Sequence, residues 1–159
     1  MIPTLILDGS VAPETCEKVI QIYGGNISQS HTFGNPQFYP LNLENITDGQ
    51  NEVRDIIYSN LATANKIFDG LVLEWAEIVR RPIGSWHAWH RDLASPETKA
   101  ASITFLNDNF RGGELVLFDG TKIAPVAGRT VFFAGVKHEH SVNPFFHNDR
   151  YVIAAWYKR

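Results

Sequence analysis

Two separated stretches of the chain contain residues whose types and spacing suit the binding of a transition metal. The first, WHAWHRD (residues 86–92), contains His90 and Asp92 in a His-x-Asp triplet. The second, KHEHSVNP (residues 137–144), contains His140. Two imidazoles and one carboxylate on one face of an iron(II) ion leave its other positions open for a substrate and oxygen. The pattern therefore indicates a mononuclear metal site that supports redox chemistry.

A positively charged residue follows the second stretch. Arg150 opens the apolar run YVIAAWY (residues 151–157), which predicts a strand. A cation that faces the interior from such a strand needs an anionic partner, because burying an unpaired charge is unfavourable. A dicarboxylate co-substrate would be such a partner, so we group Arg150 with the metal candidates.

The remaining histidines are weaker candidates. A second His-x-Asp triplet, formed by His147 and Asp149, lies in FFHND after Pro144, where the composition predicts a solvent-exposed turn. A single histidine such as His138 is more often structural or on the surface than a metal ligand. The context therefore favours the first triplet.

The composition is that of an ordinary globular domain. The chain has 159 residues, 44% hydrophobic and 19% charged, and we expect one domain over residues 1–159 with a single core. The net charge of −3 gives no support for nucleic-acid binding. Cys16 is the only cysteine, which excludes an internal disulfide. With no basic leader and no membrane-length apolar run, we expect a cytoplasmic protein.

Helical periodicity is found between residues 1 and 70. Pro13 suits the first turn of a helix that ends at Gly24 and Gly25. Its apolar face comprises Cys16, Val19, Ile20 and Tyr23. Residues 26–47 predict a long loop, either a lid over a binding site or a packed surface excursion. Asp48 is a predicted cap of a second helix, whose expected apolar face comprises Val53, Ile56, Ile57, Leu61, Ala64 and Ile67.

Short runs of β-branched and aromatic residues, separated by turn-forming residues, predict strands in the rest of the chain. The predicted strands are Thr4–Leu7, Leu71–Arg80, Ser102–Asn107, Glu114–Phe118, Thr130–Gly135 and Tyr151–Tyr157. Two helices followed by such strands predict an α+β, mainly β fold. Its helical part covers residues 1–70 and its antiparallel sandwich or jelly-roll core covers residues 71–159.

Over residues 73–157 the sequence resembles the iron(II)- and 2-oxoglutarate-dependent oxygenases, and within them the prolyl hydroxylase-like branch. The matching pieces are RPIGSWHAWHRD, SITFLND, RGGELVLF, APVAGRTVFF, HSVNP and DRYVIAAWY. The resemblance implies a double-stranded β-helix, which is a jelly-roll or cupin-like core, with the two N-terminal helices packed on it.

The resemblance also implies roles for individual residues. His90, Asp92 and His140 match the metal triad of the family, and Arg150 matches the basic residue that binds the distal carboxylate of 2-oxoglutarate. His140 is preferred to His138 because it carries the x-Val-x-Pro sequence that follows the family's histidine.

Two tyrosines that are usual in this branch are replaced. Arg81 stands before the Pro-x-Gly bend, and Phe105 stands where a second tyrosine often contacts the co-substrate. Phe105 has no hydroxyl group, so co-substrate binding would depend more on Arg150 or on another group, such as Thr104 or Thr130. Arg81 would serve as a second cation if it faces the cavity, and it would be solvated if it faces outward.

The activity implied by the resemblance is hydroxylation coupled to oxidative decarboxylation. Iron(II), 2-oxoglutarate and oxygen are the implied cofactor and co-substrates, succinate and carbon dioxide are the co-products, and ascorbate is a further candidate cofactor. Trp86, His87 and Trp89 flank the triad and are candidates for the substrate wall. The leading substrate is a prolyl residue in a peptide or protein; a free amino acid, another small molecule or a nucleobase stays open.

A different class of protein would keep the barrel and drop the redox chemistry. A cupin-like domain could bind zinc or nickel through His87, His90 and His140, as a hydrolase, an isomerase or a sensor without catalysis. Arg150 separates the two hypotheses, because the cupin-like alternative has no use for it.

Overall fold

The computed structural model describes residues 3–24, 37–40, 50–92, 94–134 and 137–159. Within these ranges the helices are α1 (Pro13–Gly24) and α2 (Gln50–Phe68). The strands are β1 (Leu5–Leu7), β2 (Gln37–Pro40), β3 (Val72–Arg81), β4 (His87–His90), β5 (Thr98–Phe105), β6 (Arg111–Gly112), β7 (Leu115–Leu117), β8 (Lys122–Ile123), β9 (Thr130–Phe133), β10 (His140–Val142), β11 (Phe145–Phe146) and β12 (Arg150–Lys158).

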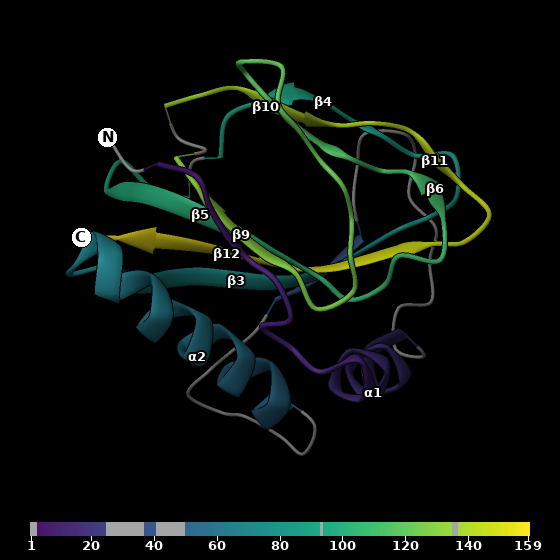
Figure 1. Ribbon diagram of the computed structural model, residues 1–159, viewed down its shortest axis with the longest axis horizontal. Coiled ribbons are helices and arrows are strands. Elements are labelled where there is room, and N and C mark those ends of the chain that lie inside the picture. Colours follow the sequence, from purple (N-terminus) through teal and green to yellow (C-terminus); the bar gives the residue numbers. More distant parts are fainter. Residues whose placement is uncertain (1–2, 25–36, 41–49, 93, 135–136) are drawn as a thin grey trace.

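The strands form two large antiparallel sheets and one small one. The six-stranded sheet has the order β1-β9-β5-β12-β3-β2, the four-stranded sheet has the order β4-β10-β7-β8, and β11 pairs with β6. In Figure 1 β4 and β10 lie at the top, opposite β12 and β3 of the larger sheet. This two-sheet arrangement confirms the predicted α+β, mainly β fold with a jelly-roll core.

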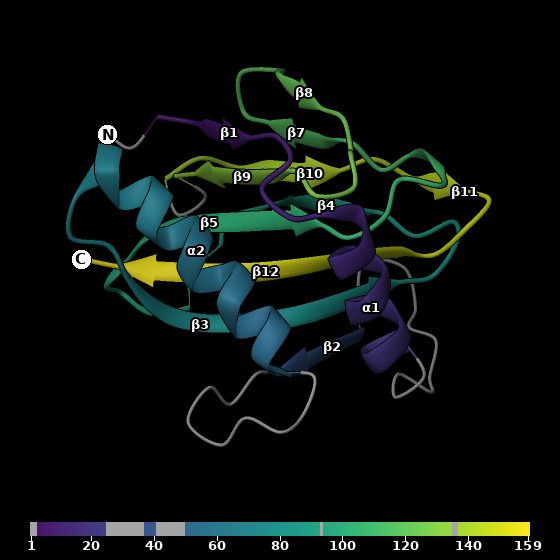
Figure 2. The same cartoon turned by 60° about the horizontal axis from the view of Figure 1, so that its bottom comes forward.

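Both helices cover the outer face of the six-stranded sheet (Figures 1 and 2). They bury their apolar faces against alternate residues of β3 and β12, such as Ile78 and Ile153. In α2 the buried apolar residues are Val53, Ile56, Ile57, Leu61, Ala64 and Phe68. The prediction for Ile67 was wrong: it is 60% exposed, because Phe68 continues the stripe at helical spacing from Ala64. Neither described helix is both long and apolar enough to cross a membrane.

A second apolar core lies between the two large sheets. The opposite faces of β3, β5 and β12 contribute Val79, Phe105 and Val152, and the four-stranded sheet contributes Leu115 and Leu117. Side chains on a strand alternate between its faces, so the odd-numbered residues of β3 and the even-numbered residues of β12 point into this space. These are the positions that carry the candidate site.

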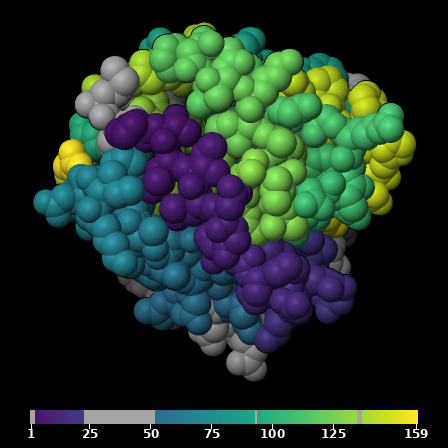
Figure 3. Space-filling model, viewed as in Figure 1, coloured from purple at the N-terminus to yellow at the C-terminus, as the bar shows by residue number. Residues whose placement is uncertain are grey.

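The N-terminal part is joined to the sheet as well as packed on it. β1 pairs with β9 and β2 pairs with β3, so both ends of the six-stranded sheet come from the first 40 residues. Figure 3 shows the purple N-terminal segment lying between the blue surface of α2 and the green surface of later strands. A strand at 37–40 is a correction to the loop predicted over 26–47; the remainder of that loop, and the predicted cap Asp48, lie outside the described residues.

Candidate functional site

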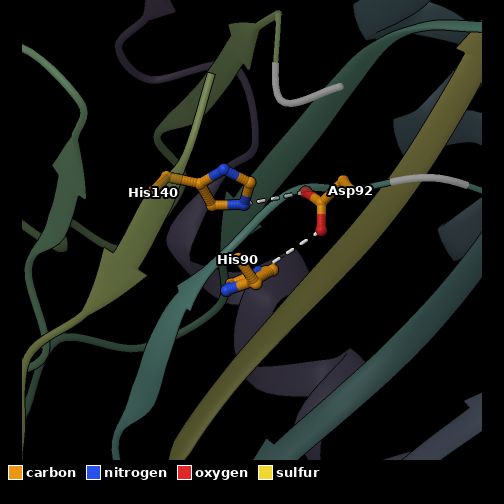
Figure 4. A group of neighbouring side chains, drawn as sticks. All are labelled: His90, Asp92 and His140. Carbon is orange, nitrogen blue, oxygen red and sulfur yellow. Dashed lines mark ion pairs between the residues drawn. The ribbon is translucent and has the colours of Figure 1, made fainter. Parts of the chain in front are cut away.

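The pairing of β4 with β10 brings the two candidate histidine ligands together. His90 is the last residue of β4 and His140 is the first residue of β10, and the two are direct partners across the antiparallel ladder. Directly opposed residues in such a ladder have side chains only about 5 Å apart. Asp92 follows β4 and turns its carboxylate towards both imidazole rings (Figure 4).

The three side chains form a compact group of metal-ligand atoms. The distance from Asp92 Oδ1 to His90 Nε2 is 3.3 Å, and that from Asp92 Oδ2 to His140 Nε2 is 3.0 Å. All three ligand atoms lie within 4.8 Å of one another. Burial alone would raise the pKa of Asp92, but its contacts with His140 and then His90 hold that pKa below its usual range. The site therefore offers a carboxylate anion in contact with two imidazoles.

Backbone carbonyl groups stand ready to orient both imidazoles towards a metal. His90 Nδ1 lies 2.7 Å from the Ala88 carbonyl oxygen, and His140 Nδ1 lies 3.3 Å from that of His138. A carbonyl only accepts hydrogen bonds, so with a metal bound each Nδ1–H would donate to its carbonyl and each Nε2 would give its lone pair to the metal. Two imidazole nitrogens and one carboxylate are the ligand set of non-haem iron(II) oxygenases, so these residues fit that metal.

Two arginines face each other at the other side of the site. Arg150, the first residue of β12, is the register partner of Arg81, the last residue of β3. Arg150 is 1% exposed and Arg81 is 4% exposed. Burial, followed by the charge of Arg81, lowers the pKa of Arg150 to about 9; burial also lowers the pKa of Arg81 to about 10. Both guanidinium groups therefore stay charged at neutral pH.

These guanidinium groups have donors without acceptors. Among the described residues, Arg150 Nε and Nη2 and Arg81 Nη1 are buried and make no hydrogen bond. Like charges directly opposite each other in a sheet are destabilising, and an unpaired buried charge is more so. An anion bound between the sheets would accept hydrogen bonds from both arginines. A co-substrate with a carboxylate group therefore fits this part of the site.

One cavity joins the metal group to the arginines. It lies between the two large sheets and is bordered by strands β3, β4, β5, β10 and β12. The polar or charged residues of its wall are Glu77, Arg81, His87, His90, Asp92, Ser102, His140 and Arg150. A ligand in this cavity can thus contact the metal ligands and the arginines at once.

His87 lies inside the cavity but not among the metal ligands. Its ring stacks on His90 with centroids 3.5 Å apart, and its Nδ1 accepts a hydrogen bond of 2.8 Å from Arg81 Nη2. Burial, followed by the charge of Arg81, lowers the pKa of His87 to about 3, so the ring is neutral at physiological pH. His87 therefore holds the position of both His90 and Arg81.

The structure places the two predicted tryptophans elsewhere. Trp86 is 38% exposed and Trp89 is 53% exposed, and both line an open groove along β4 and β10 that shares His87 and Val142 with the cavity. Neither side chain is part of the cavity wall. Of the three candidates for the substrate wall, only His87 lies in the cavity.

Thr104 and Phe105 point in opposite directions because they are consecutive residues of a strand. Phe105 lies under Arg150, with the guanidinium carbon 5.3 Å from its ring centroid, and packs with the inner core. Thr104 faces the helices, where its hydroxyl bonds to that of Thr130 at 2.8 Å, and Thr130 in turn accepts a hydrogen bond from Asn60. Thr104 and Thr130 are thus bonded to each other and not to the cavity.

The second His-x-Asp triplet has a structural role instead of a purely solvated one. His147 is exposed and has a positive φ of 93°, as a turn residue would. Asp149, however, accepts two hydrogen bonds from the Arg80 side chain and Ile83 N–H, and its side chain is only 21% exposed. The prediction of a solvated turn missed this contact because Arg80 lies on a different strand.

Among the cavity residues that were not singled out from the sequence, two have side chains that suit ligand binding. Glu77 lines the cavity from β3, and Trp156 lines it from β12. The signal was present in the alternation of strand residues: Glu77 shares a face with Arg81, and Trp156 shares a face with Arg150. Using that signal requires the register between the two strands, which the sequence does not state.

Comparisons with known proteins agree with this geometry. A model of the 2OG-Fe(II) oxygenase superfamily matches residues 76–158, which include all three metal-ligand candidates and Arg150. A search of curated proteins gives no match.

Several solved structures share the fold over nearly the whole chain. The viral collagen prolyl hydroxylase of Paramecium bursaria Chlorella virus-1 has a TM-score of 0.74 at 18% identity, covering 98% of this chain and 94% of that one. A Pseudomonas putida prolyl-4-hydroxylase has a TM-score of 0.72 at 20% identity, covering 98% and 92%. A Trichoplax adhaerens prolyl hydroxylase, in complex with a hypoxia inducible factor peptide, has a TM-score of 0.77 at 16% identity, covering 99% and 84%.

These structures confirm the double-stranded β-helix fold. The matching family uses iron(II), 2-oxoglutarate and oxygen, and the group formed by His90, Asp92 and His140 suits that metal. Because the family model covers more than half of the chain, the protein belongs to the 2OG-Fe(II) oxygenase superfamily and is an oxygenase.

Proposed function

We propose that this oxygenase hydroxylates a prolyl residue in a peptide or protein and releases succinate and carbon dioxide. The observation that carries the co-substrate assignment is the pair of buried arginines with unpaired donors in the same cavity as the metal-ligand group. A dicarboxylic acid that chelates the metal at one end and meets the arginines at the other would satisfy both features.

Each residue of the site has a role in this proposal. His90, Asp92 and His140 hold iron(II), and the metal with its co-substrates supplies the oxidative chemistry when bound. Arg150 donates to the distal carboxylate of 2-oxoglutarate from its Nε and Nη2, which have no partner among the described residues. Arg81 adds a second cation, which compensates for the missing hydroxyl group at Phe105.

The cupin-like alternative fits the geometry less well. It needs His87 as a ligand, but His87 Nδ1 accepts from Arg81, and the group of ligand atoms found among the described residues consists of His90, Asp92 and His140. It also gives no reason for two buried arginines that face each other and have donors without acceptors among the described residues. A zinc or nickel protein with that triad would not need them.

The choice of a prolyl substrate rests on the solved structures. Those with the same fold include a viral collagen prolyl hydroxylase, a bacterial prolyl-4-hydroxylase and a prolyl hydroxylase bound to a peptide fragment. We therefore propose a peptide or protein substrate, with His87 as part of the wall that meets it. Trp86 and Trp89 do not line the cavity itself; they line the adjoining groove, where a peptide that extends from the cavity would meet them.

The test is a turnover assay with defined peptides. The iron(II)-loaded protein is incubated with 2-oxoglutarate, oxygen, ascorbate and synthetic prolyl peptides, and succinate and peptide mass are measured. We expect succinate and the gain of one oxygen atom on a prolyl residue, and neither product with Asp92→Ala. Succinate coupled to oxidation of a free amino acid, with all prolyl peptides unchanged, would show that the substrate is wrong. No succinate under any condition would refute the activity itself.

A further inference from the structure

The cavity has opposite charges at its two ends. Arg81 and Glu77 lie on the same face of β3 and both line the cavity. They are four residues apart, which in a strand corresponds to about 13 Å. Arg81 is paired in register with Arg150, whereas Glu77 is paired with Ala154. The end occupied by the arginines is therefore cationic, and the end occupied by Glu77 carries a carboxylate.

An aromatic side chain stands beside this carboxylate. Trp156 lines the cavity from β12, and its register partner on β3 is Trp75, two residues from Glu77. Trp156 and Glu77 are thus diagonal neighbours on one face of the sheet, a spacing within reach of aromatic and long side chains. The residue directly opposite Glu77 is Ala154, which also lines the cavity and whose small side chain occupies little of it.

Among the described residues, Glu77 forms no ion pair with a positively charged side chain. All fourteen lysines and arginines lie in the described part of the chain, and none of the ion pairs found there involves Glu77. The hydrogen bond that its Oε1 accepts comes from Trp75 Nε1, at 3.0 Å. Burial, opposed by this hydrogen bond and aided by the charge of Asp92, raises the pKa of Glu77. The ionised side chain is thus less stable here than in water.

We infer that Glu77 and Trp156 form a subsite for a positively charged group of the substrate, an ammonium or guanidinium group carried next to the residue that is hydroxylated. A cation in this position would pair with the carboxylate and lie against the indole face, and a desolvated cation–π contact strengthens such binding. The inference rests on the proposed function, because it assigns substrate, and not co-substrate, to this end of the cavity. In a prolyl peptide the neighbouring residue would be lysine or arginine.

The arginines at the other end support this division of the cavity. A dicarboxylate held by Arg150 and Arg81 leaves the Glu77 end for the second ligand, and the anionic co-substrate is repelled from that end. The field across the cavity therefore orients two ligands of opposite charge. A substrate with an acidic group beside the reacting residue would meet both Glu77 and Asp92 and be disfavoured.

The test compares peptides that differ only in charge. Three peptides of equal length contain one proline flanked by lysine, by norleucine or by glutamate. Their binding to the protein loaded with iron(II) and 2-oxoglutarate is measured by calorimetry without oxygen, so that no turnover is needed. We expect the lysine peptide to bind about tenfold more tightly than the norleucine peptide, and the glutamate peptide to bind most weakly.

Two variants separate charge from shape. Glu77→Gln keeps the shape of the side chain and an acceptor for Trp75, so the preference for lysine should vanish while the norleucine peptide binds as before. Glu77→Lys should reverse the order of the charged peptides. Glu74→Gln is the matched control: Glu74 is on the same strand but accepts a hydrogen bond from Thr98 and does not line the cavity, so the preference should remain.

A second probe is independent of proline. n-Butylammonium should bind more tightly than n-butanol to the wild type, and equally weakly to Glu77→Gln. Three outcomes would overturn the inference. The wild type could bind charged and neutral probes equally among both the peptides and the butyl compounds, or it could bind none of them. The preference for the charged probe could also survive Glu77→Gln. The absorption band of bound 2-oxoglutarate, recorded on the same samples, reports the co-substrate separately: its presence without a charge preference refutes only the subsite, and its absence refutes the proposed function.

Discussion

Replacing Arg150 with methionine should make the ligand-free protein more stable and remove its stabilisation by 2-oxoglutarate. In the ligand-free structure the Arg150 side chain is 1% exposed, two of its donor nitrogens have no partner among the described residues, and Arg81 faces it across the sheet. Methionine is unbranched and of similar length, so it can pack over Phe105 without a charge.

The size of the effect follows from the loss of an unpaired buried cation. Even a buried ion pair can often be replaced by apolar residues of similar volume with a gain of up to about 4 kcal/mol, and we expect a gain of about 1–4 kcal/mol for a buried cation that has no anionic partner. For a chain of this length each kcal/mol shifts the melting temperature by about 2–4 °C, so we expect Arg150→Met to melt several degrees above the wild type. A ligand at one hundred times its Kd stabilises the wild type by about 2.7 kcal/mol, and a hundredfold loss of affinity reduces this to about 0.4 kcal/mol.

The assay is thermal unfolding with and without 2-oxoglutarate at one fixed concentration, in the presence of metal. The exposed Arg111 supplies the control: Arg111→Met makes the same change of composition and should alter neither the melting temperature nor the ligand response. The reasoning would be refuted if Arg150→Met melted below the wild type, or if it kept the full shift with 2-oxoglutarate.

Three further predictions concern other parts of the chain. Asp149→Ala should keep the metal but lose about 1–2 kcal/mol of unfolding free energy, because it removes the pairing with Arg80; unchanged stability together with metal loss would contradict this. Gly112→Ala should lower the melting temperature without affecting metal affinity, since Gly112 has a φ of +82° and a Cβ there would meet the Pro144 carbonyl; an unchanged melting temperature would be evidence against that clash. Because the pKa of Glu77 is raised by folding, the stability of the wild type should fall, relative to Glu77→Gln, as the pH rises above its ordinary value of 4.5; parallel pH profiles in chemical denaturation would argue against this.

The parts of the fold that could be predicted are those in which a pattern of apolar residues continues over many residues. The buried stripe of α2 and the alternation along β3 and β12 extend over many residues, so their type and approximate position follow from the sequence. β4 and β10, which carry His90 and His140, are only four and three residues long, too short for an alternating pattern to stand out. The motifs located these histidines, but the ladder between them was visible only in the structure.

The details of the site depend on strand register. Nothing in the local sequence indicates that Arg81 lies opposite Arg150, or that Thr104 faces the helices while Phe105 faces the cavity side, because a shift of one residue would exchange the two faces. The same holds for Asp149, whose partner Arg80 is far away in the sequence. The residue types therefore predicted the metal-ligand group, but the residues that share its cavity depend on the register between strands and could not be predicted.

The most direct test of the site is an anaerobic titration of the iron(II)-loaded protein with 2-oxoglutarate, followed by the weak visible charge-transfer band of a metal-chelated keto acid. We predict a saturable band in the wild type, no band in Asp92→Ala because the anionic ligand of the metal is gone, and a band in Arg150→Ala only at concentrations higher by orders of magnitude, with partial recovery in Arg150→Lys. The absence of a band in the wild type, or an unchanged titration curve in Arg150→Ala, would contradict the assignment of this cavity to iron(II) and 2-oxoglutarate.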